Sequence, residues 1–192
     1  MHTLIFATNN RNKVAEIQSL VGPNFEIIPL KEAGIEIDIP EPHDQLEANA
    51  LEKAMTIFKL TNQACFSEDT GLEIAALYGA PGVKSARYAG ENSNAQANID
   101  LVSSKMTGVE NRAAQFRTVI CLIWKNQTYY FEGICKGQIL TTMQGENGFG
   151  YDPIFVPDGA SKSFANMTMD EKNQFSHRKK AVTQLFEFLG TL

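Results

Sequence analysis

The sequence predicts an α/β protein with a mixed β-sheet, flanking helices and two lobes around a central groove. Two patterns favour this architecture. Short apolar runs alternate with amphipathic helical segments, as in βα units, and one long antiparallel hairpin is predicted between residues 112 and 135. The length adds a third observation, because 192 residues with 43% hydrophobic content suit one good-sized domain or two small lobes. We therefore expect residues 1–192 to form a single domain.

The N-terminal third predicts a strand, a helix, a second strand and a longer helix. Residues 2–7 are an apolar run typical of a central strand, and the helical pattern that follows stops at a Gly-Pro pair. Residues 25–29 predict the second strand, and residues 31–45 predict a loop with a short strand. Residues 46–60 predict an amphipathic helix. The inward faces of the two helices are expected to hold Val14, Ile17, Leu20, Val21, Leu46, Ala50, Ala54, Ile57 and Phe58.

The remaining two thirds predict one buried strand, an irregular segment, the hairpin and three helices. The hairpin is the clearest signal, because apolar residues alternate with polar ones. Residues 79–90 are expected to be irregular, since they are rich in Gly and Pro. The other elements are expected at residues 64–67 (strand), 94–106 (helix), 112–125 and 128–135 (hairpin), 170–175 (helix) and after His177 (helix).

Composition limits the partners and the location. The net charge of −5 argues against a nucleic-acid polymer, which would need a broad basic face, but allows one small anion. No apolar run reaches the roughly 18 residues of a membrane span, and the first residues lack the layout of a signal peptide. Cys65, Cys121 and Cys135 form no Cys-x-x-Cys pair, so we expect buried, reduced thiols in a cytoplasmic protein.

A polar and basic segment joins the first predicted strand to the first helix. Backbone N–H groups at a helix start favour anions, and this segment adds side-chain donors and positive charge. Helix capping by Asn or Thr explains one such residue but not the whole set, so phosphate binding is favoured over capping. The residues are Thr8, Asn9, Asn10, Arg11, Asn12 and Lys13.

Carboxylates occur at two further places that matter for chemistry. Glu47 lies in the first turn of the helix over residues 46–60 and Lys53 near its inward face, but spacing alone favours a solvated helix flank. Glu68 and Asp69 follow a buried strand, where α/β proteins collect ligands. The pair could hold Mg²⁺ and orient or deprotonate a water, although a turn capped by Asp69 explains it equally well.

Two C-terminal segments combine aromatic rings with cations. Residues 148–153 offer close backbone approach at glycine, with a tight turn packed by core aromatics as an equal alternative. A His-Arg pair starts the last helix, where cations oppose the helix dipole, so we expect an anion nearby. The candidate residues are Phe149, Gly150, Tyr151, Asp152, Lys172, His177 and Arg178.

Taken together, these segments resemble the Ham1/inosine triphosphatase family of non-standard purine nucleoside triphosphate pyrophosphatases. The resemblance covers almost the whole chain, and six motifs in register make it specific. The matching segments are Thr8-Asn9-Asn10 with Lys13, Glu47 with Asn49-Ala50 and Lys53-Ala54, residues 68–72, residues 79–88, residues 148–155, and Lys172-Asn173 with Ser176-His177-Arg178.

The resemblance implies a homodimeric α/β enzyme that uses Mg²⁺ to hydrolyse ITP, XTP and dITP to the monophosphate and pyrophosphate. It implies that Asp69 is the proton acceptor, and that Glu47 and Asp69 lie close to the metal with Glu68 assisting. Residues 8–13 would hold phosphates. The charge on the phosphate oxygens would be offset by Lys13, Lys53, Lys172 and Arg178. The rest of the nucleotide would meet Thr70, Phe149, Gly150, Tyr151, Asp152, Lys172, His177 and Arg178, the last two selecting the 6-oxo group.

Two rival functions stay open. A nucleotide-binding regulatory module without catalysis would need phosphate-binding cations but no carboxylate pair, so Glu68 and Asp69 speak against it. A related pyrophosphatase acting on modified pyrimidine nucleotides would differ only in base preference. Pyrophosphate release tests the first rival, and rates on ITP and a pyrimidine triphosphate test the second.

Overall fold

The computed structural model describes residues 2–92 and 94–191. The chain divides into two compact units, each assembled from separate stretches of sequence. Unit 1 comprises Met1–Asp69, Thr118–Gly133 and Arg178–Leu192, and unit 2 comprises Thr70–Arg117 and Ile134–His177. Parallel and antiparallel strand pairs occur together, which confirms the α/β class with a mixed sheet. The single domain and the central groove stay predictions.

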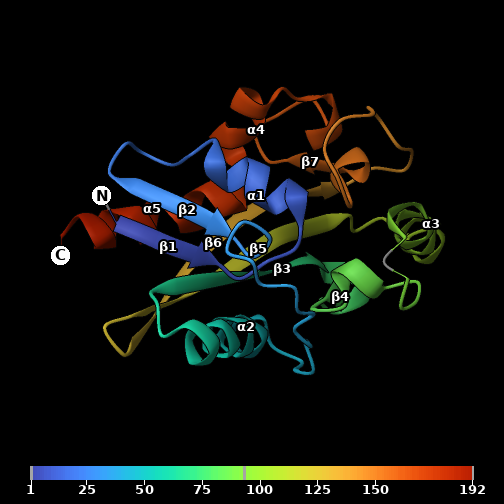
Figure 1. The fold of residues 1–192 in the computed structure, drawn as a ribbon. Helices are drawn as coiled ribbons and strands as arrows, with labels where there is room; N and C mark the ends of the chain where they lie inside the picture. The colour runs from blue at the N-terminus through green and yellow to red at the C-terminus, as the bar shows by residue number, and fades with distance from the viewer. Residues whose placement is uncertain (1, 93, 192) are drawn as a thin grey trace. The chain divides into compact units, whose positions relative to one another are not determined.

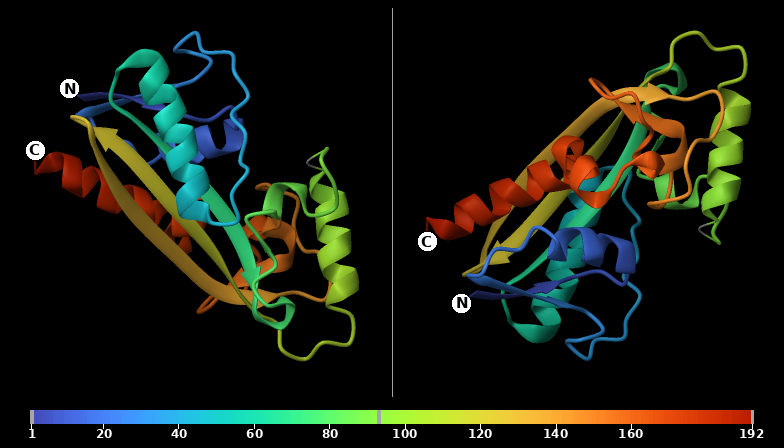
Figure 2. Two further views of the ribbon diagram at one scale, coloured as in Figure 1. Left: turned by 90° about the horizontal axis from the view of Figure 1, so that it is seen from below. Right: turned by 90° about the horizontal axis from the view of Figure 1, so that it is seen from above.

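Unit 1 is built on parallel strands with helices packed against them (Figures 1 and 2). β1 pairs in parallel with β2 and with the first residues of β3, and the strand order is β2-β1-β3-β5-β6. One connection is a βα crossover through α1, as the sequence predicts. The elements are β1 (His2–Phe6), α1 (Arg11–Gln18), β2 (Phe25–Pro29), α2 (Leu46–Thr61), the start of β3 (Cys65–Ile74), the hairpin end of β5 (Ala113–Trp124) and β6 (Gln127–Ile139), and α5 (His177–Gly190).

The core of unit 1 lies between the sheet and the helices α1 and α5. Phe6 of β1 and Phe66 of β3 stack with ring centroids 4.5 Å apart. Helix α2 is tied to other positions of β3, because the Cys65 thiol donates to the Ala54 carbonyl oxygen at 3.3 Å and the Ser67 hydroxyl donates to that of Ala50. The buried residues of the core between the sheet and helices α1 and α5 are Leu4, Phe6, Ile17, Ile27, Phe66, Ile120, Leu122, Ala181, Val182, Leu185 and Leu189.

Unit 2 holds the other ends of the long strands. Its strand order is β3-β5-β6-β7, with β4 pairing antiparallel to β3. Helix α4 begins with a capping box, in which the Thr168 hydroxyl accepts from the Glu171 N–H and the Glu171 carboxylate accepts from the Thr168 N–H. The further elements are four 3₁₀ turns (Ala75–Leu77, Ser85–Arg87, Asp152–Ile154 and Phe164–Asn166), β4 (Pro81–Gly82), α3 (Ala95–Lys105), β7 (Phe155–Pro157) and α4 (Met169–Phe175).

Strand β3 is much longer than predicted. The sequence suggests an end at residue 67, with Glu68 and Asp69 beyond it, but the strand continues to Ile74. The expectation that the two carboxylates follow the strand is wrong. The reason is tertiary, because β4 pairs with β3 at Leu72 and Glu73 and continues the ladder.

Smaller differences have local causes. Helix α1 ends at Gln18, so Leu20 and Val21 of the predicted face lie in the turn that follows it. Residues 31–45 contain no strand, which corrects the short strand predicted there. The hairpin turn is made by Lys125 and Asn126, both with positive φ, so β6 begins one residue earlier than predicted.

Two expectations from the sequence, on membrane spans and on the cysteines, can be compared with the structure. No helix within residues 2–92 and 94–191 combines the length and apolar character that crossing a membrane requires. Cys65, Cys121 and Cys135 are buried and form no disulfide, as expected. Burial raises the pKa of both Cys65 and Cys121 to about 12.

Candidate active site

The neighbouring carboxylates of Glu68 and Asp69 form two clusters rather than one pair. Both residues are almost fully buried in β3. Successive residues of a strand point to opposite faces of a sheet, so two adjacent carboxylates diverge. Their partners agree with this rule, because Asp69 contacts α2 whereas Glu68 contacts Arg178 of α5.

The Asp69 cluster joins β3 to α2 and to the preceding loop. The Lys53 ammonium donates to Asp69 Oδ1 at 2.9 Å and also to the Glu41 carboxylate. The Asn49 amide donates to Asp69 Oδ2 at 3.4 Å. Asn49 itself is oriented by two hydrogen bonds with the backbone of His43, at 2.9 and 3.0 Å. Asp69 is therefore held on both oxygens, with Lys53 shared between two carboxylates.

The electrostatics of this cluster favour a proton acceptor. Burial raises the pKa of Asp69; Lys53 and Lys13 oppose that rise and Glu41 adds to it. Burial lowers the pKa of Lys53, but Asp69 and Glu41 outweigh burial and raise it overall. Lys53 therefore stays charged, while Asp69 is a stronger base than an ordinary aspartate.

Glu41 is the residue of the Asp69 cluster that the sequence interpretation missed. It lies in the loop before α2, between Pro40 and Pro42, where no helical or strand periodicity draws attention to it. Two flanking prolines restrict the backbone of an acidic residue, and this was the available signal. Glu47, which the resemblance places near the metal, lies in the first turn of α2. Its charge is one of the causes that raise the pKa of Tyr130, after burial and Cys121.

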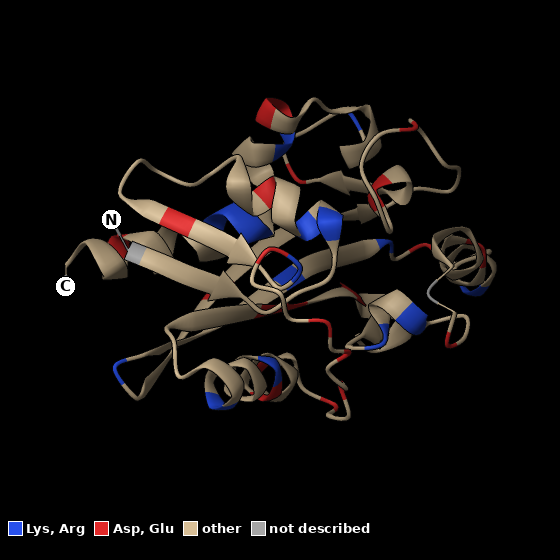
Figure 3. Ribbon diagram, in the orientation of Figure 1, with Lys and Arg blue, Asp and Glu red and all other residues tan. Residues whose placement is uncertain are grey.

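The Glu68 cluster is a closed ion network. The Arg178 guanidinium grips Glu68 with two parallel bonds, Nε to Oε2 and Nη2 to Oε1, both 2.8 Å. Its Nη1 donates to the carboxylate of Glu16 in α1, and Lys13 Nζ lies 3.2 Å from Glu68 Oε1. Figure 3 shows both signs of charge on α1. Burial lowers the pKa of Arg178, but Glu68 and Glu16 outweigh burial and raise it.

This network changes the interpretation of two predicted residues. Arg178 is almost fully buried and bound to two carboxylates of unit 1, and its predicted contact with the base stays a prediction. Glu68 has a guanidinium on both oxygens, so a role as metal ligand fits less well than it does for Asp69.

The segment before α1 caps the helix. Asn10 Oδ1 accepts from the N–H groups of Asn12 and Lys13 at 3.0 and 3.2 Å, so capping explains more of this segment than the sequence suggests. The Asn10 N–H donates to the Thr8 hydroxyl at 3.2 Å, and the Asn9 amide donates to the carbonyl of residue 37 at 2.9 Å. Arg11 and Asn12 are exposed. The cation that this segment brings to the carboxylates is Lys13.

A third cluster lies in unit 2 and is organised around Asp152. Its Oδ2 accepts from the Lys172 ammonium at 2.7 Å and from the Phe149 N–H at 2.9 Å. The Lys172 ammonium lies 5.1 Å from the ring centre of Phe149 and 5.2 Å from that of Phe164, a cation–π arrangement. A Cβ on Gly148 would lie 2.1 Å from Asp152 Oδ2, so only glycine fits there. Sequence reasoning identified Phe149, Asp152 and Lys172, and the structure brings them together.

The other predicted residues of unit 2 lie outside the contacts of the Asp152 cluster described above. The Tyr151 hydroxyl donates to the Ser85 carbonyl oxygen at 2.8 Å, and burial raises its pKa. The His177 ring stacks on Phe116, with centroids 4.9 Å apart. Thr70 is half-buried in β3, and Gly150 has a φ of +60° in the turn before Tyr151.

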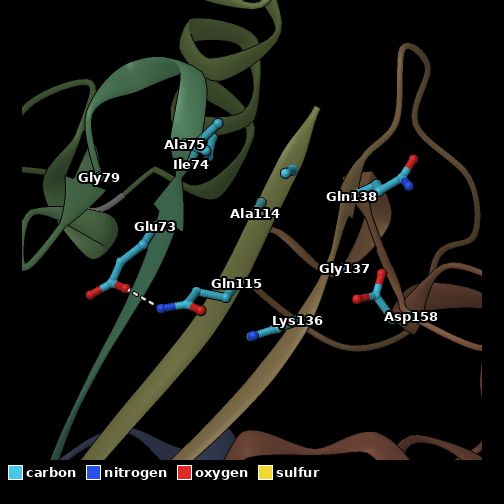
Figure 4. A pocket seen from close by; sticks show the side chains of 11 residues that line it. Glu73, Ile74, Ala75, Gly79, Ala114, Gln115, Lys136, Gly137, Gln138 and Asp158 are labelled. Carbon is cyan, nitrogen blue, oxygen red and sulfur yellow. Dashed lines mark hydrogen bonds between the residues drawn. The ribbon is translucent and has the colours of Figure 1, made fainter. Parts of the chain in front are cut away.

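Unit 2 also carries a surface hollow of about 510 Å³, shown in Figure 4. Polar side chains line it, and Gln115 donates to Glu73 at 2.7 Å across two strands. None of the predicted site residues is among the lining residues, so the hollow gives no support to the predicted site. The lining is Glu73, Ile74, Ala75, Gly79, Ala113, Ala114, Gln115, Lys136, Gly137, Gln138 and Asp158.

No compact group of three or more His, Cys, Asp or Glu side chains exists within residues 2–92 and 94–191. Two carboxylates, Glu41 and Asp69, share Lys53, and this is the number of protein ligands that Mg²⁺ commonly takes beside water and phosphate.

Comparisons with known proteins give one consistent result. A model of the Ham1 family matches residues 4–188. A dITP/XTP pyrophosphatase of Porphyromonas gingivalis is 49% identical, and that of Flavobacterium johnsoniae 47%, over 98% and 97% of both chains. Among solved structures, a HAM1 protein from Coxiella burnetii is 35% identical with a TM-score of 0.91, covering 100% of both chains. The Staphylococcus aureus Ham1 protein is 36% identical with a TM-score of 0.89, covering 98% of both.

Proposed function

The chain belongs to the Ham1 family, and on this premise we propose that it hydrolyses non-standard purine nucleoside triphosphates. The substrates are dITP, XTP and ITP, and the products are the nucleoside monophosphate and pyrophosphate. Relatives at 45–49% identity over nearly the whole chain carry the name dITP/XTP pyrophosphatase. The reaction would remove such nucleotides from the pool.

The observation that carries the proposal is the buried Asp69 with its held orientation and raised pKa. An aspartate that is more basic than usual, and fixed by Asn49 and Lys53, can orient a water and accept its proton. General base assistance of this kind contributes about 10²–10⁴-fold to a rate. A module that only bound nucleotides would have no use for this arrangement.

Glu41 and Asp69 are the residues that would hold Mg²⁺. Over both clusters of unit 1, the residues Lys13, Lys53 and Arg178 carry three positive charges, and Glu16, Glu41, Glu68 and Asp69 carry four negative ones. The surplus negative charge lies where Lys53 faces two carboxylates, which favours a cation there. Bound Mg²⁺ would neutralise charge on the phosphate oxygens and lower the pKa of a bound water.

The two lysines are the phosphate-binding groups of unit 1. Lys53 holds Asp69 in place and adds positive charge beside the base. Lys13 is bound to Glu68 and its side chain is 16% exposed, so its ammonium can meet a phosphate oxygen. Phosphoryl-transfer catalysis depends mainly on such positioning and charge stabilisation.

Recognition of the base is assigned to the cluster around Asp152 in unit 2. Phe149 offers an aromatic face, and Lys172 offers N–H donors beside it. A donor suits the 6-oxo group of hypoxanthine and xanthine, and opposes the amino group of adenine. In this proposal Arg178 is assigned to the ion network with Glu68 and Glu16, and the selectivity test on Arg178 decides whether it also reads the base.

We extend the proposal to a cytoplasmic homodimer. Buried reduced thiols suit a reducing compartment. Tyr78 is fully exposed beside the irregular segment, whereas Tyr88 packs on the core of unit 2. Light scattering at micromolar concentration checks the dimer, and a protein that stays monomeric there contradicts it.

The reaction is tested with a substrate panel and identification of both products. We expect pyrophosphate and IMP from ITP, and faster turnover of ITP, dITP and XTP than of ATP, GTP or a modified pyrimidine triphosphate. IDP with orthophosphate as first products would overturn the bond assignment. A preference for the pyrimidine nucleotide would overturn the substrate class.

A further inference from the structure

Glu16 is a buried carboxylate that the proposed reaction does not use. It lies in the second turn of α1 and is 5% exposed. Buried charges in proteins are almost always paired, so a glutamate at such a position has a specific partner. Its partner is Arg178, in a helix 162 positions further along the chain.

The contacts form a continuous chain of charges inside unit 1. Glu16 accepts from Arg178 Nη1, while the other edge of the same guanidinium binds both oxygens of Glu68. Glu68 Oε1 is in turn 3.2 Å from the Lys13 ammonium. Signs alternate along this chain, and its outer end is the lysine that our proposed function gives to the phosphates.

We infer that Glu16 is a positioning residue: it holds Arg178 against Glu68, and Glu68 thereby holds the Lys13 ammonium in place for the triphosphate. The inference rests on the proposed function, since Lys13 matters only if a polyphosphate binds. It requires no contact between Glu16 and substrate.

The planar guanidinium explains why Glu16 matters at such a remove. An arginine fork fixes a carboxylate bidentately only when the fork itself is held in one plane. Glu68 accepts from Nε and Nη2, and Glu16 accepts from the third nitrogen, Nη1. Without the charge of Glu16, Arg178 loses one of the two carboxylates that bind it, and Arg178 and Lys13, whose like charges repel each other, compete more strongly for Glu68.

Two substitutions at position 16 separate charge from packing. Glu16→Gln keeps the volume and removes the charge, whereas Glu16→Asp keeps the charge and shortens the side chain by one methylene. A positioning role predicts that Glu16→Asp retains more activity than Glu16→Gln. A role in packing alone predicts the reverse order.

The deciding experiment is a double-mutant cycle with Lys13→Met, read as kcat/KM for ITP. We expect Glu16→Gln to lower the value about tenfold in the wild-type background, which is typical of residues that orient a ligand group. In the Lys13→Met background it should lower the value by less than about twofold, because the group that it positions is gone. Equal losses in both backgrounds would overturn the inference. If Glu16→Gln does not fold, Glu16→Asp replaces it in the cycle: its smaller loss of kcat/KM should again shrink in the Lys13→Met background, and an equal loss in both backgrounds would overturn the inference.

Controls keep this outcome apart from failure of the proposed function. Glu187→Gln, an exposed change on α5, should leave kcat/KM unchanged. A wild-type protein without activity on ITP would refute the proposed function, and the cycle is then read as affinity for inorganic tripolyphosphate by calorimetry. Coupling between positions 13 and 16 in that affinity supports the inference, and additivity overturns it.

Discussion

The two faces of β3 treat neighbouring carboxylates in opposite ways. Glu68 is bound on both oxygens by Arg178, and Glu16 balances the second cation of that group. Asp69 shares the ammonium that is bound to it, Lys53, with Glu41, and its pKa is raised by burial. The charge of Glu68 is well compensated by its partners, whereas that of Asp69 is compensated less completely, and Asp69 is the carboxylate to which we assign the chemistry.

The comparison shows that burial alone does not identify a functional carboxylate. Both residues are within a few per cent of complete burial. They differ in how far partners offset the lost hydration, since an arginine fork offsets it well and a shared lysine does so poorly. A raised carboxyl pKa in a cluster with surplus negative charge is the pattern of a functional site.

The sharpest test of the comparison is Asp69→Asn. The change is nearly isosteric and removes the proposed base, so we expect kcat on ITP to fall about 10²–10⁴-fold. The stability of Asp69→Asn at pH 8 should equal or exceed that of the wild type. A carboxyl group whose pKa is raised on folding weakens the fold above its ordinary pKa, and the amide removes that penalty.

Steady-state kinetics at saturating Mg²⁺ and thermal unfolding measure the two quantities. Asp100→Asn, in an exposed position of α3, serves as the matched control. Turnover near the wild-type value in Asp69→Asn would move the base to another residue, and Glu41 would be examined next.

Glu68→Gln tests the other face of β3, and we expect it to lower the free energy of unfolding. The substitution takes from the buried Arg178 one of the two carboxylates that bind it, and from Lys13 the carboxylate of its ion pair. Breaking a buried ion pair at one partner costs about 3–5 kcal/mol. Urea denaturation measures the loss, with the exposed Glu26→Gln as the control. An unfolding free energy equal to that of the wild type would show that the Glu68 network is not structural.

The fold was largely predictable because its elements carry local signals. Most helices and strands of unit 1 follow from periodicity and from punctuation by Gly and Pro. The extension of β3 to Ile74 was not predictable, because it depends on pairing with β4, a strand of two residues. Such short strands are made by their partners, and no pattern in two residues announces them.

The residues of the candidate site could be selected from the sequence, but the way they group in space could not. The sequence brings forward Asp69, Lys53 and Asp152, whose partners now lie close by in space. It could not separate Glu68 from Asp69, because the assignment of a face requires knowing that both lie inside one strand. Nor could it give Arg178 its partner Glu16, since the contact joins residues from opposite ends of the chain.

A metal titration sharpens the Asp69 side of the comparison. Glu41→Gln removes one of the two carboxylates around Lys53, so the Mg²⁺ concentration at half-maximal rate should rise about 10–100-fold. Glu47→Gln, in the first turn of α2, is the matched variant and should change that concentration little. The opposite ranking would restore Glu47 as the metal ligand and leave Glu41 as a partner of Lys53.

The smallest expected effect concerns the preference for ITP over ATP, and it compares Asp152 of unit 2 with Arg178, the partner of Glu68. Asp152→Asn keeps the shape of the side chain and removes the charge that fixes Lys172 beside Phe149. We expect the ratio of kcat/KM for ITP to that for ATP to fall about tenfold, because this ratio reports differential binding in the transition state. Arg178→Lys should lower both values together and preserve the ratio, since this arginine meets Glu68 and Glu16 instead of the base. A ratio that collapses in Arg178→Lys and persists in Asp152→Asn would return base selection to the start of α5.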